Sequence, residues 1–97
     1  MILRIFRVET EPDATETFQD FFLSTALPMM RSTDGCISVT AGLPRPETPT
    51  HFALVMTWRD EAALEAFVGG DWRTPHIAPE EEGVVRARWL DHYTLAE

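Results

Sequence analysis

The most informative hydrophobic pattern in the chain runs from His51 to His76 and changes midway from strand-like to helix-like spacing. Large apolar residues stand at every second position from Phe52 to Trp58, and the positions between them are also small or apolar. Such a segment is typical of a strand that is buried on both faces. We therefore expect a strand over His51–Trp58 in the interior of a sheet.

A helix is predicted directly after this strand. Asp60 is a suitable N-cap, because its carboxylate can accept hydrogen bonds from the free amides of a first helical turn. Apolar residues then recur at helical spacing, Leu64 and Phe67 among them, until Gly69. A glycine takes the left-handed conformation that ends a helix at little cost, so we expect the helix to end there.

The beginning of the chain predicts a second interior strand, over Ile2–Val8. Ile2, Phe6 and Val8 would lie on one face, and Leu3 and Ile5 on the other. Neither face is plainly polar. This strand, like the one before Asp60, should therefore have neighbours on both sides.

The helix after the first strand should begin near Asp13, as an N-cap, or near Thr10 with a proline in its first turn. Spacings of three and four residues place three phenylalanines on one buried face: Phe18, Phe21 and Phe22. Pro28 has no backbone N–H and crowds the preceding turn, so the helix should end or kink near Leu27.

Alternating residues predict a third strand over Cys36–Leu43, and the prolines between Leu43 and Thr50 indicate a stiff connection to the next strand. A short helical piece is expected over Trp72–Thr74. A single helical turn over Pro79–Glu82 should present its glutamates to solvent rather than to a metal ion. The last strand is expected over Val84–Tyr93.

These elements predict a β-α-β-β-α-β order, which is the ferredoxin-like α+β fold with a four-stranded antiparallel sheet and both helices on one face. We expect one domain over residues 1–97. Because the strands over Ile2–Val8 and His51–Trp58 are apolar on both faces, the face without helices would expose a large apolar surface. The economical solution is a homodimer in which two copies pack sheet against sheet.

The charge and composition of the chain restrict the classes of molecule that it is expected to bind. The net charge is −8, with 16 acidic residues against 8 basic ones, all of them arginines, so an acidic surface disfavours nucleic acid. No apolar run approaches the roughly 20 residues that cross a bilayer, and the N-terminus does not resemble a signal peptide, so we expect a cytoplasmic protein without membrane contact. Cys36 stands alone, which excludes an internal disulfide and predicts a small buried side chain.

The chain resembles the antibiotic biosynthesis monooxygenase (ABM) family of dimeric α+β barrels. The residues that carry the resemblance are the opening strand 2–8, Pro28-Met29-Met30 before Gly35-Cys36, Trp58 with Asp60, Ala63-Leu64 and Phe67, and Pro75-His76. The resemblance covers nearly the whole chain. It implies a homodimer whose barrel interior is the dimer core, with a ligand pocket in each subunit between the helices and the sheet.

The resemblance also implies a function, that of a cofactor-independent monooxygenase acting on a small aromatic or quinol-type substrate. In that reaction the substrate enolate or phenolate itself reduces oxygen. Trp58 would stack on the substrate and donate its indole proton to a substrate oxygen, His76 would act as the base, and Arg73 would stabilise the anion. Phe22 and Phe67 would form pocket walls.

Two other functions stay open. Heme-degrading members of the family use an asparagine, a tryptophan and an axial histidine; Trp58 and His76 match by spacing, but the chain contains no asparagine and offers Phe6 and Arg7 instead. Heme is thus the alternative to a site without cofactor or metal. The third possibility is a non-catalytic dimeric ligand-binding domain, since a fold does not fix a function.

Structural roles compete with each of these assignments. Trp58 ends a core strand and can be purely a packing residue. His76 can be a surface or helix-capping residue. His51 and His92, near strand ends, are expected at the surface.

Overall fold

The computed structural model describes residues 1–96 of the chain. The strands are β1 (Ile2–Thr10), β2 (Cys36–Gly42), β3 (His51–Trp58) and β4 (Val85–Thr94). The α-helices are α1 (Thr15–Phe21), α2 (Leu27–Ser32) and α3 (Glu61–Val68). A π-helical segment, Phe22–Ala26, joins α1 to α2, and 3-10 turns lie at Pro12–Ala14 and Pro79–Glu81.

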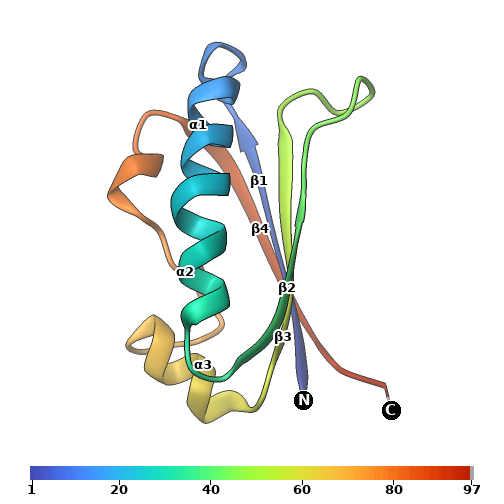
Figure 1. Cartoon of the computed structure of the whole chain (residues 1–97), viewed down its shortest axis with the longest axis vertical. Coiled ribbons are helices and arrows are strands. Elements are labelled where there is room, and N and C mark those ends of the chain that lie inside the picture. The colour runs from blue at the N-terminus through green and yellow to red at the C-terminus, as the bar shows by residue number, and fades with distance from the viewer. Residues whose placement is uncertain (97) are drawn as a thin grey trace.

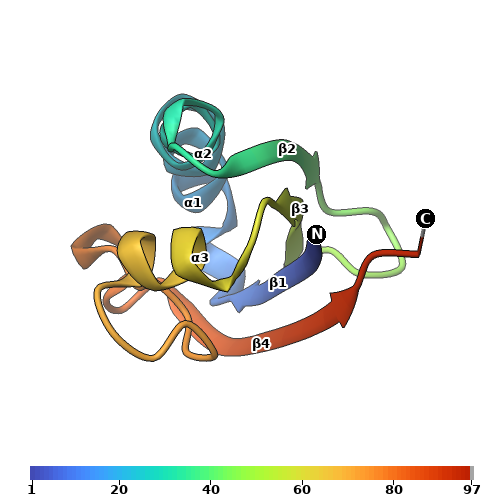
Figure 2. The same ribbon diagram turned by 90° about the horizontal axis from the view of Figure 1, so that it is seen from below.

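The four strands form one antiparallel sheet in the order β2-β3-β1-β4. The helices lie on the same side of this sheet (Figures 1 and 2). The ferredoxin-like α+β fold is therefore confirmed, and so is the prediction that β1 and β3 are the two interior strands. Both chain termini lie at the same end of the sheet (Figure 1).

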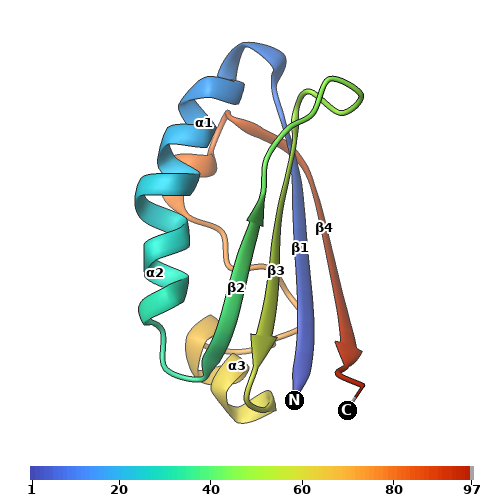
Figure 3. The same ribbon diagram turned by 45° about the vertical axis from the view of Figure 1, so that its right-hand side comes forward.

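The two faces of the sheet differ sharply. On β3, every second residue is buried under the helices, from Phe52 at 2% exposure to Trp58 at 0%. The residues between them face the other way, where no helix covers the sheet (Figure 3). Val55, Trp89 and Tyr93 are 38%, 42% and 54% exposed on this open face. The alternation predicted for the strand thus separates a filled core face from an apolar face in solvent.

The long helical segment corrects one prediction and decides between two alternatives in another. It begins with a 3-10 turn that has Pro12 in its first turn, and neither Thr10 nor Asp13 caps it. An end or a kink was expected near Leu27, and the helix does not end there, because it continues past Pro28 to Ser32. The backbone N–H of Leu27 donates to the carbonyl of Phe22, the i to i+5 bond of a π-helix, and this wider turn gives the proline ring room.

Helix α3 begins as predicted, because the Asp60 side chain accepts a hydrogen bond from the backbone N–H of Ala63 at 2.8 Å. It ends at Gly69, whose φ of 80° is left-handed. The piece Trp72–Thr74, predicted to be helical, is a turn. Asp71 does act there, but its carboxylate accepts from the backbone N–H of Arg73 within the turn. None of the helices over residues 1–96 is long and apolar enough to cross a membrane.

Candidate functional site

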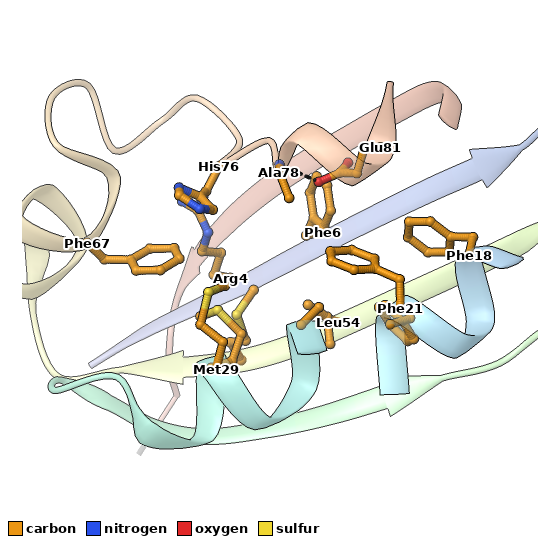
Figure 4. Close-up of a pocket in the computed structure, with 14 residues that line it drawn as sticks. Arg4, Phe6, Phe18, Phe21, Met29, Leu54, Phe67, His76, Ala78 and Glu81 are labelled. Atoms are coloured by element: carbon orange, nitrogen blue, oxygen red, sulfur yellow. Dashed lines mark hydrogen bonds between the residues drawn. The ribbon is translucent and has the colours of Figure 1, made fainter. Parts of the chain in front are cut away.

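A small cavity lies between the helical segment α1–α2 and the core face of the sheet, and residues 76–81 close its third side (Figure 4). Its volume is about 50 Å³, which is room for roughly three water molecules. Most of the side chains that line it are aromatic or apolar, including Phe6, Phe18, Phe21, Phe22, Leu54 and Phe67. Three lining side chains can carry charge: Arg4, His76 and Glu81.

Arg4 projects from the middle of β1 onto the core face and is only 2% exposed. Its Nη1 atom donates to the carbonyl of Trp72 at 2.6 Å, and its Nη2 atom donates to the carbonyl of Thr74 at 3.1 Å. Burial lowers the pKa of Arg4 to about 10, so the guanidinium still carries its charge at neutral pH. No carboxylate of the described residues lies within ion-pair distance of it.

His92 stands directly opposite Arg4 on the neighbouring strand β4. Its Nε2 atom lies 2.8 Å from Nη1 of Arg4. Its ring meets that of Trp72 edge to face, with the centroids 4.9 Å apart. Desolvation, and then the charge of Arg4, lower the pKa of His92. The prediction of a surface residue is corrected: His92 is half-buried and is part of the support of Arg4.

His76 lies at the cavity end that Phe67 closes (Figure 4). The centroids of these two rings are 4.7 Å apart, and the centroid of Phe67 lies 5.3 Å from that of Trp58. The three rings therefore form a row from the open side of the cavity into the core. His76 itself is exposed to solvent on its outer side, so a proton taken from a ligand could pass from it directly to water.

Trp58 is fully buried and stands behind Phe67, outside the set of residues that line the cavity. Its indole N–H is buried without a hydrogen-bond partner among the described residues. Buried polar groups are almost always satisfied, and an exception calls for a functional or structural reason. The core position predicted for this tryptophan is observed, together with an indole donor that has no acceptor among residues 1–96.

Arg73 does not reach the cavity. Its side chain is 73% exposed and pairs with the carboxylate of Asp71, with Nε and Oδ1 2.9 Å apart. The turn at Trp72–Thr74 directs it outward, whereas a helix had been expected at this point. Phe22 and Phe67, the two predicted wall residues, do line the cavity.

Glu81 corrects the expectation that residues 80–82 form a solvated acidic face. It is 4% exposed. One carboxylate oxygen accepts from the backbone N–H of Ala78 at 2.8 Å, and the other accepts from Nε of Arg88 at 3.1 Å. Both oxygens are thus engaged, and the contact with Arg88 on β4 fastens the segment that forms the third wall of the cavity.

Arg4 is the site residue that sequence reasoning missed, although a signal was present. Inward-facing residues of a strand recur every second position, so the face that carries Ile2, Phe6 and Val8 must also carry Arg4. A charged residue in a row of core positions is rare unless it is paired or functional. The apolar alternation correctly predicted the strand, but the charged residue within it, Arg4, was the indication of a functional site.

Metal-binding groups are sparse. Over residues 1–96 there is no group of three or more histidine, cysteine, aspartate or glutamate side chains that could hold a metal ion. Cys36 is half-buried, and burial raises the pKa of its thiol. Its Sγ atom lies 3.6 Å from the carbonyl oxygen of Ser38, so it has a local contact and does not face the cavity.

Comparison with known proteins gives a consistent result. The family model of the antibiotic biosynthesis monooxygenases matches residues 1–72. A comparison with the curated proteins gives no match.

Several solved structures have the same fold. A protein from Deinococcus radiodurans is similar with a TM-score of 0.80 at 14% identity, over 100% of this chain and 94% of that one. PA3566 from Pseudomonas aeruginosa is similar with a TM-score of 0.76 at 21% identity, over 98% and 94%. Rv0793 from Mycobacterium tuberculosis is similar with a TM-score of 0.75 at 20% identity, over 99% and 95%. At these identities the likeness concerns the fold alone.

Proposed function

We propose, from the premise that this chain belongs to the antibiotic biosynthesis monooxygenase family, that it is a cofactor-independent monooxygenase for a small aromatic or quinol-type substrate. One observation carries the proposal: an apolar, aromatic-lined cavity with a buried guanidinium and an accessible imidazole in its wall. Such a lining suits a flat aromatic body that bears one acidic oxygen.

The reaction we propose converts an activated methylene or phenolic carbon with molecular oxygen. For a methylene, two C–H bonds break, one oxygen atom becomes the new carbonyl oxygen, and the other leaves as water. The substrate supplies the electrons through its enolate or phenolate, so the protein has to orient it, remove one proton and stabilise the anion.

The base in this proposal is His76. An imidazole nitrogen within reach of an acidic ligand proton is the side-chain group most often used as a general base. Its ring stands between the cavity and solvent, beside Phe67. A proton accepted from the substrate can therefore leave to bulk water without crossing the core.

The role proposed for Trp58 is to donate its unused indole N–H to a substrate oxygen. Phe67 now separates the indole from the cavity, so this contact requires that Phe67 move when the substrate enters. Entry requires a wider cavity in any case. Met29 and Met30 line it, and Met29 is 38% exposed. Unbranched methionine side chains change conformation readily, so this wall of the cavity is the one most able to move when a substrate enters.

Heme fits the site poorly. A porphyrin is a much larger flat body than the small aromatic substrate proposed above, so this cavity of about 50 Å³ would have to widen far more to hold it. The ring of His76, the residue that would have to bind the iron, packs against that of Phe67, with the centroids 4.7 Å apart. We therefore derive no step through heme.

We further propose that the protein is a homodimer. The open sheet face carries Val55, Trp89 and Tyr93, all more than a third exposed, and no helix covers it (Figure 3). A second copy packed sheet against sheet would bury them and close the barrel. A stable interface of this kind buries more than about 1,000 Å².

Oxygen uptake with a panel of anthrones and hydroquinones tests the function. We expect turnover that falls in His76→Ala and in Trp58→Phe. Arg45→Gln serves as control, because this exposed arginine pairs with Glu47 in the β2–β3 connection. Absence of turnover with every substrate would instead favour a non-catalytic ligand-binding domain.

A further inference from the structure

We propose that Arg4 is the residue that determines ligand specificity in the cavity, and that it selects ligands that bind as oxyanions. The ligand class is a small planar aromatic molecule with one acidic phenol or enol oxygen. This inference rests on the proposed function, because it concerns the same cavity, but it assigns the anion to a residue other than Arg73.

Arg4 carries a positive charge that is buried with no carboxylate of the described residues beside it. A guanidinium that is 2% exposed has lost nearly all of its hydration. Among residues 1–96, the only carboxylate in the cavity wall is that of Glu81, and its two oxygens are engaged by Ala78 and Arg88. The cavity therefore lies against an uncompensated positive charge, which attracts an anion more strongly in this apolar setting than in water.

The guanidinium of Arg4 also has N–H groups left that can donate to a ligand. A guanidinium has five N–H groups and accepts none. Two of them point to the carbonyls of Trp72 and Thr74, and a third points to His92. The other two, on Nε and Nη2, have no acceptor among the described residues. They form the adjacent donor pair that binds an oxyanion in two places.

The side chain of Arg4 is also held rigidly. The two carbonyls belong to the turn after α3, and His92 belongs to β4, so Arg4 is held from two sides. A donor that is already fixed loses little freedom when it binds a ligand. By contrast, Arg73 is exposed and already paired with Asp71. An anion at Arg73 would have to displace that carboxylate in water, where the gain is small.

The rest of the wall limits the ligand body. Met56 stands opposite Arg4 on β3, and Phe6 and Phe67 line the same cavity; all three side chains offer only apolar contacts. A carbohydrate or a doubly charged phosphate would leave polar groups unsatisfied against these side chains. A flat ring with one charged oxygen leaves none. The oxygen then meets Arg4 while the ring meets the aromatic wall.

The test measures binding rather than turnover. The probes are 4-nitrophenol, whose absorption separates phenol from phenolate, and 4-nitroanisole, which has the same shape but cannot ionise. Benzoate tests whether a carboxylate serves as well as a phenolate. We expect the wild-type protein to bind the phenolate at least about tenfold more tightly than the anisole, and to lower the apparent pKa of bound 4-nitrophenol by about one unit. Two adjacent N–H groups also match the two oxygens of a carboxylate, so we expect benzoate to bind as well and to lose affinity in Arg4→Gln.

The variants locate the effect. In Arg4→Gln the ratio of phenolate to anisole affinity should fall towards one, and Arg4→Lys, which keeps a charge, should retain part of it. Arg45→Gln should match the wild type. The inference is overturned if the wild-type ratio is near one, if no probe binds saturably, if the affinity for benzoate is unchanged in Arg4→Gln, or if the ratio collapses in Arg73→Gln while Arg4→Gln keeps it. Arg4→Lys and the wild-type ratio decide the matter if Arg4→Gln does not fold.

These outcomes are separable from those of the proposed function. Anion-selective binding that depends on Arg4, without any oxygen uptake, would leave this inference standing and remove the monooxygenase. Turnover without a preference for anionic ligands would support the monooxygenase and overturn the role of Arg4.

Discussion

Nη1 of Arg4 lies 2.8 Å from Nε2 of His92, across the pairing of β1 with β4. Because a guanidinium only donates, Nε2 must be the acceptor, so the imidazole is neutral and carries its proton on Nδ1. One buried cation thereby fixes both the charge and the tautomer of its neighbour. The contact also links the cavity wall to the edge strand of the sheet.

This contact predicts how stability depends on pH. The pKa of His92 is lowered in the folded protein by desolvation and by Arg4, so below a pH of about 6.5 the unfolded chain binds more protons at this residue than the folded one. The contribution of His92 to the free energy of unfolding is therefore fully present above that pH. It decreases as the pH falls from about 6.5 to the lower pKa that His92 has in the folded protein. Carboxylates lose stability at lower pH still, so a difference measurement is needed.

The measurement is the free energy of unfolding of wild type minus that of His92→Gln, by denaturant titration from pH 8 to pH 5. Glutamine keeps an acceptor for Arg4 but does not titrate in this range. We expect the difference to be constant above about pH 7 and to decrease below about 6.5. A constant or growing difference down to pH 5 would contradict the assignment.

Gly35 and Gly69 make a matched pair for backbone strain and packing. Both have left-handed φ angles, 88° and 80°. A Cβ at Gly35 would overlap sterically with the Cβ of Ala63, while a Cβ at Gly69 meets nothing within 4 Å. Gly69→Ala should cost about 1–2 kcal/mol of stability, and Gly35→Ala about 1–3 kcal/mol more. Equal losses in chemical denaturation would argue that α3 shifts freely against the turn.

Glu81 is predicted to hold the third wall of the cavity in place. Replacing it with glutamine removes the charge that Arg88 uses, and the Arg88 side chain is 24% exposed, so solvent screens part of the loss. We expect Glu81→Gln to cost about 1–3 kcal/mol. The neighbouring exposed residue gives the control, since Glu80→Gln should stay within about 0.5 kcal/mol of wild type. Indistinguishable thermal melts for the two variants would count against this role.

The dimer proposal predicts a specific response to charge on the open face. Val55 lies in the middle of β3 and is 38% exposed, so Val55→Asp would bury a carboxylate in the seam. We expect light scattering to give twice the chain mass of 11.0 kDa for the wild type and a single chain mass for the variant. Leu23→Asp, an equally exposed leucine on the helical side, should remain a dimer. A monomeric wild type would contradict the proposal.

A hemin titration addresses the alternative cofactor. Because the cavity holds about 50 Å³, we expect no saturable Soret band at stoichiometric hemin. A saturable band that disappears in His76→Ala, with Arg45→Gln unchanged, would show that the wall opens far enough for a porphyrin and would restore the heme function.

The sequence by itself determined the elements and their order. Alternating apolar residues defined β3 to its exact ends, and Asp60 and Gly69 marked α3, because strand alternation and helix caps depend on neighbours within a few positions. At Pro28 the sequence left two alternatives, an end or a kink near Leu27. The helix continues there through a π-helical segment, because that outcome depends on how the whole helix packs.

Only the tertiary structure decided which arginine belongs to the site, although Phe22, Phe67 and His76 were predicted there from the sequence. Arg73 turned away to Asp71, and Arg4 gained its place from partners 68 to 88 positions away, Trp72, Thr74 and His92. A guanidinium can bind an anion strongly when it is buried and when neighbouring acceptors hold it in place. Burial and these contacts depend on which strands and turns lie together in the fold, and a local sequence pattern does not specify that arrangement.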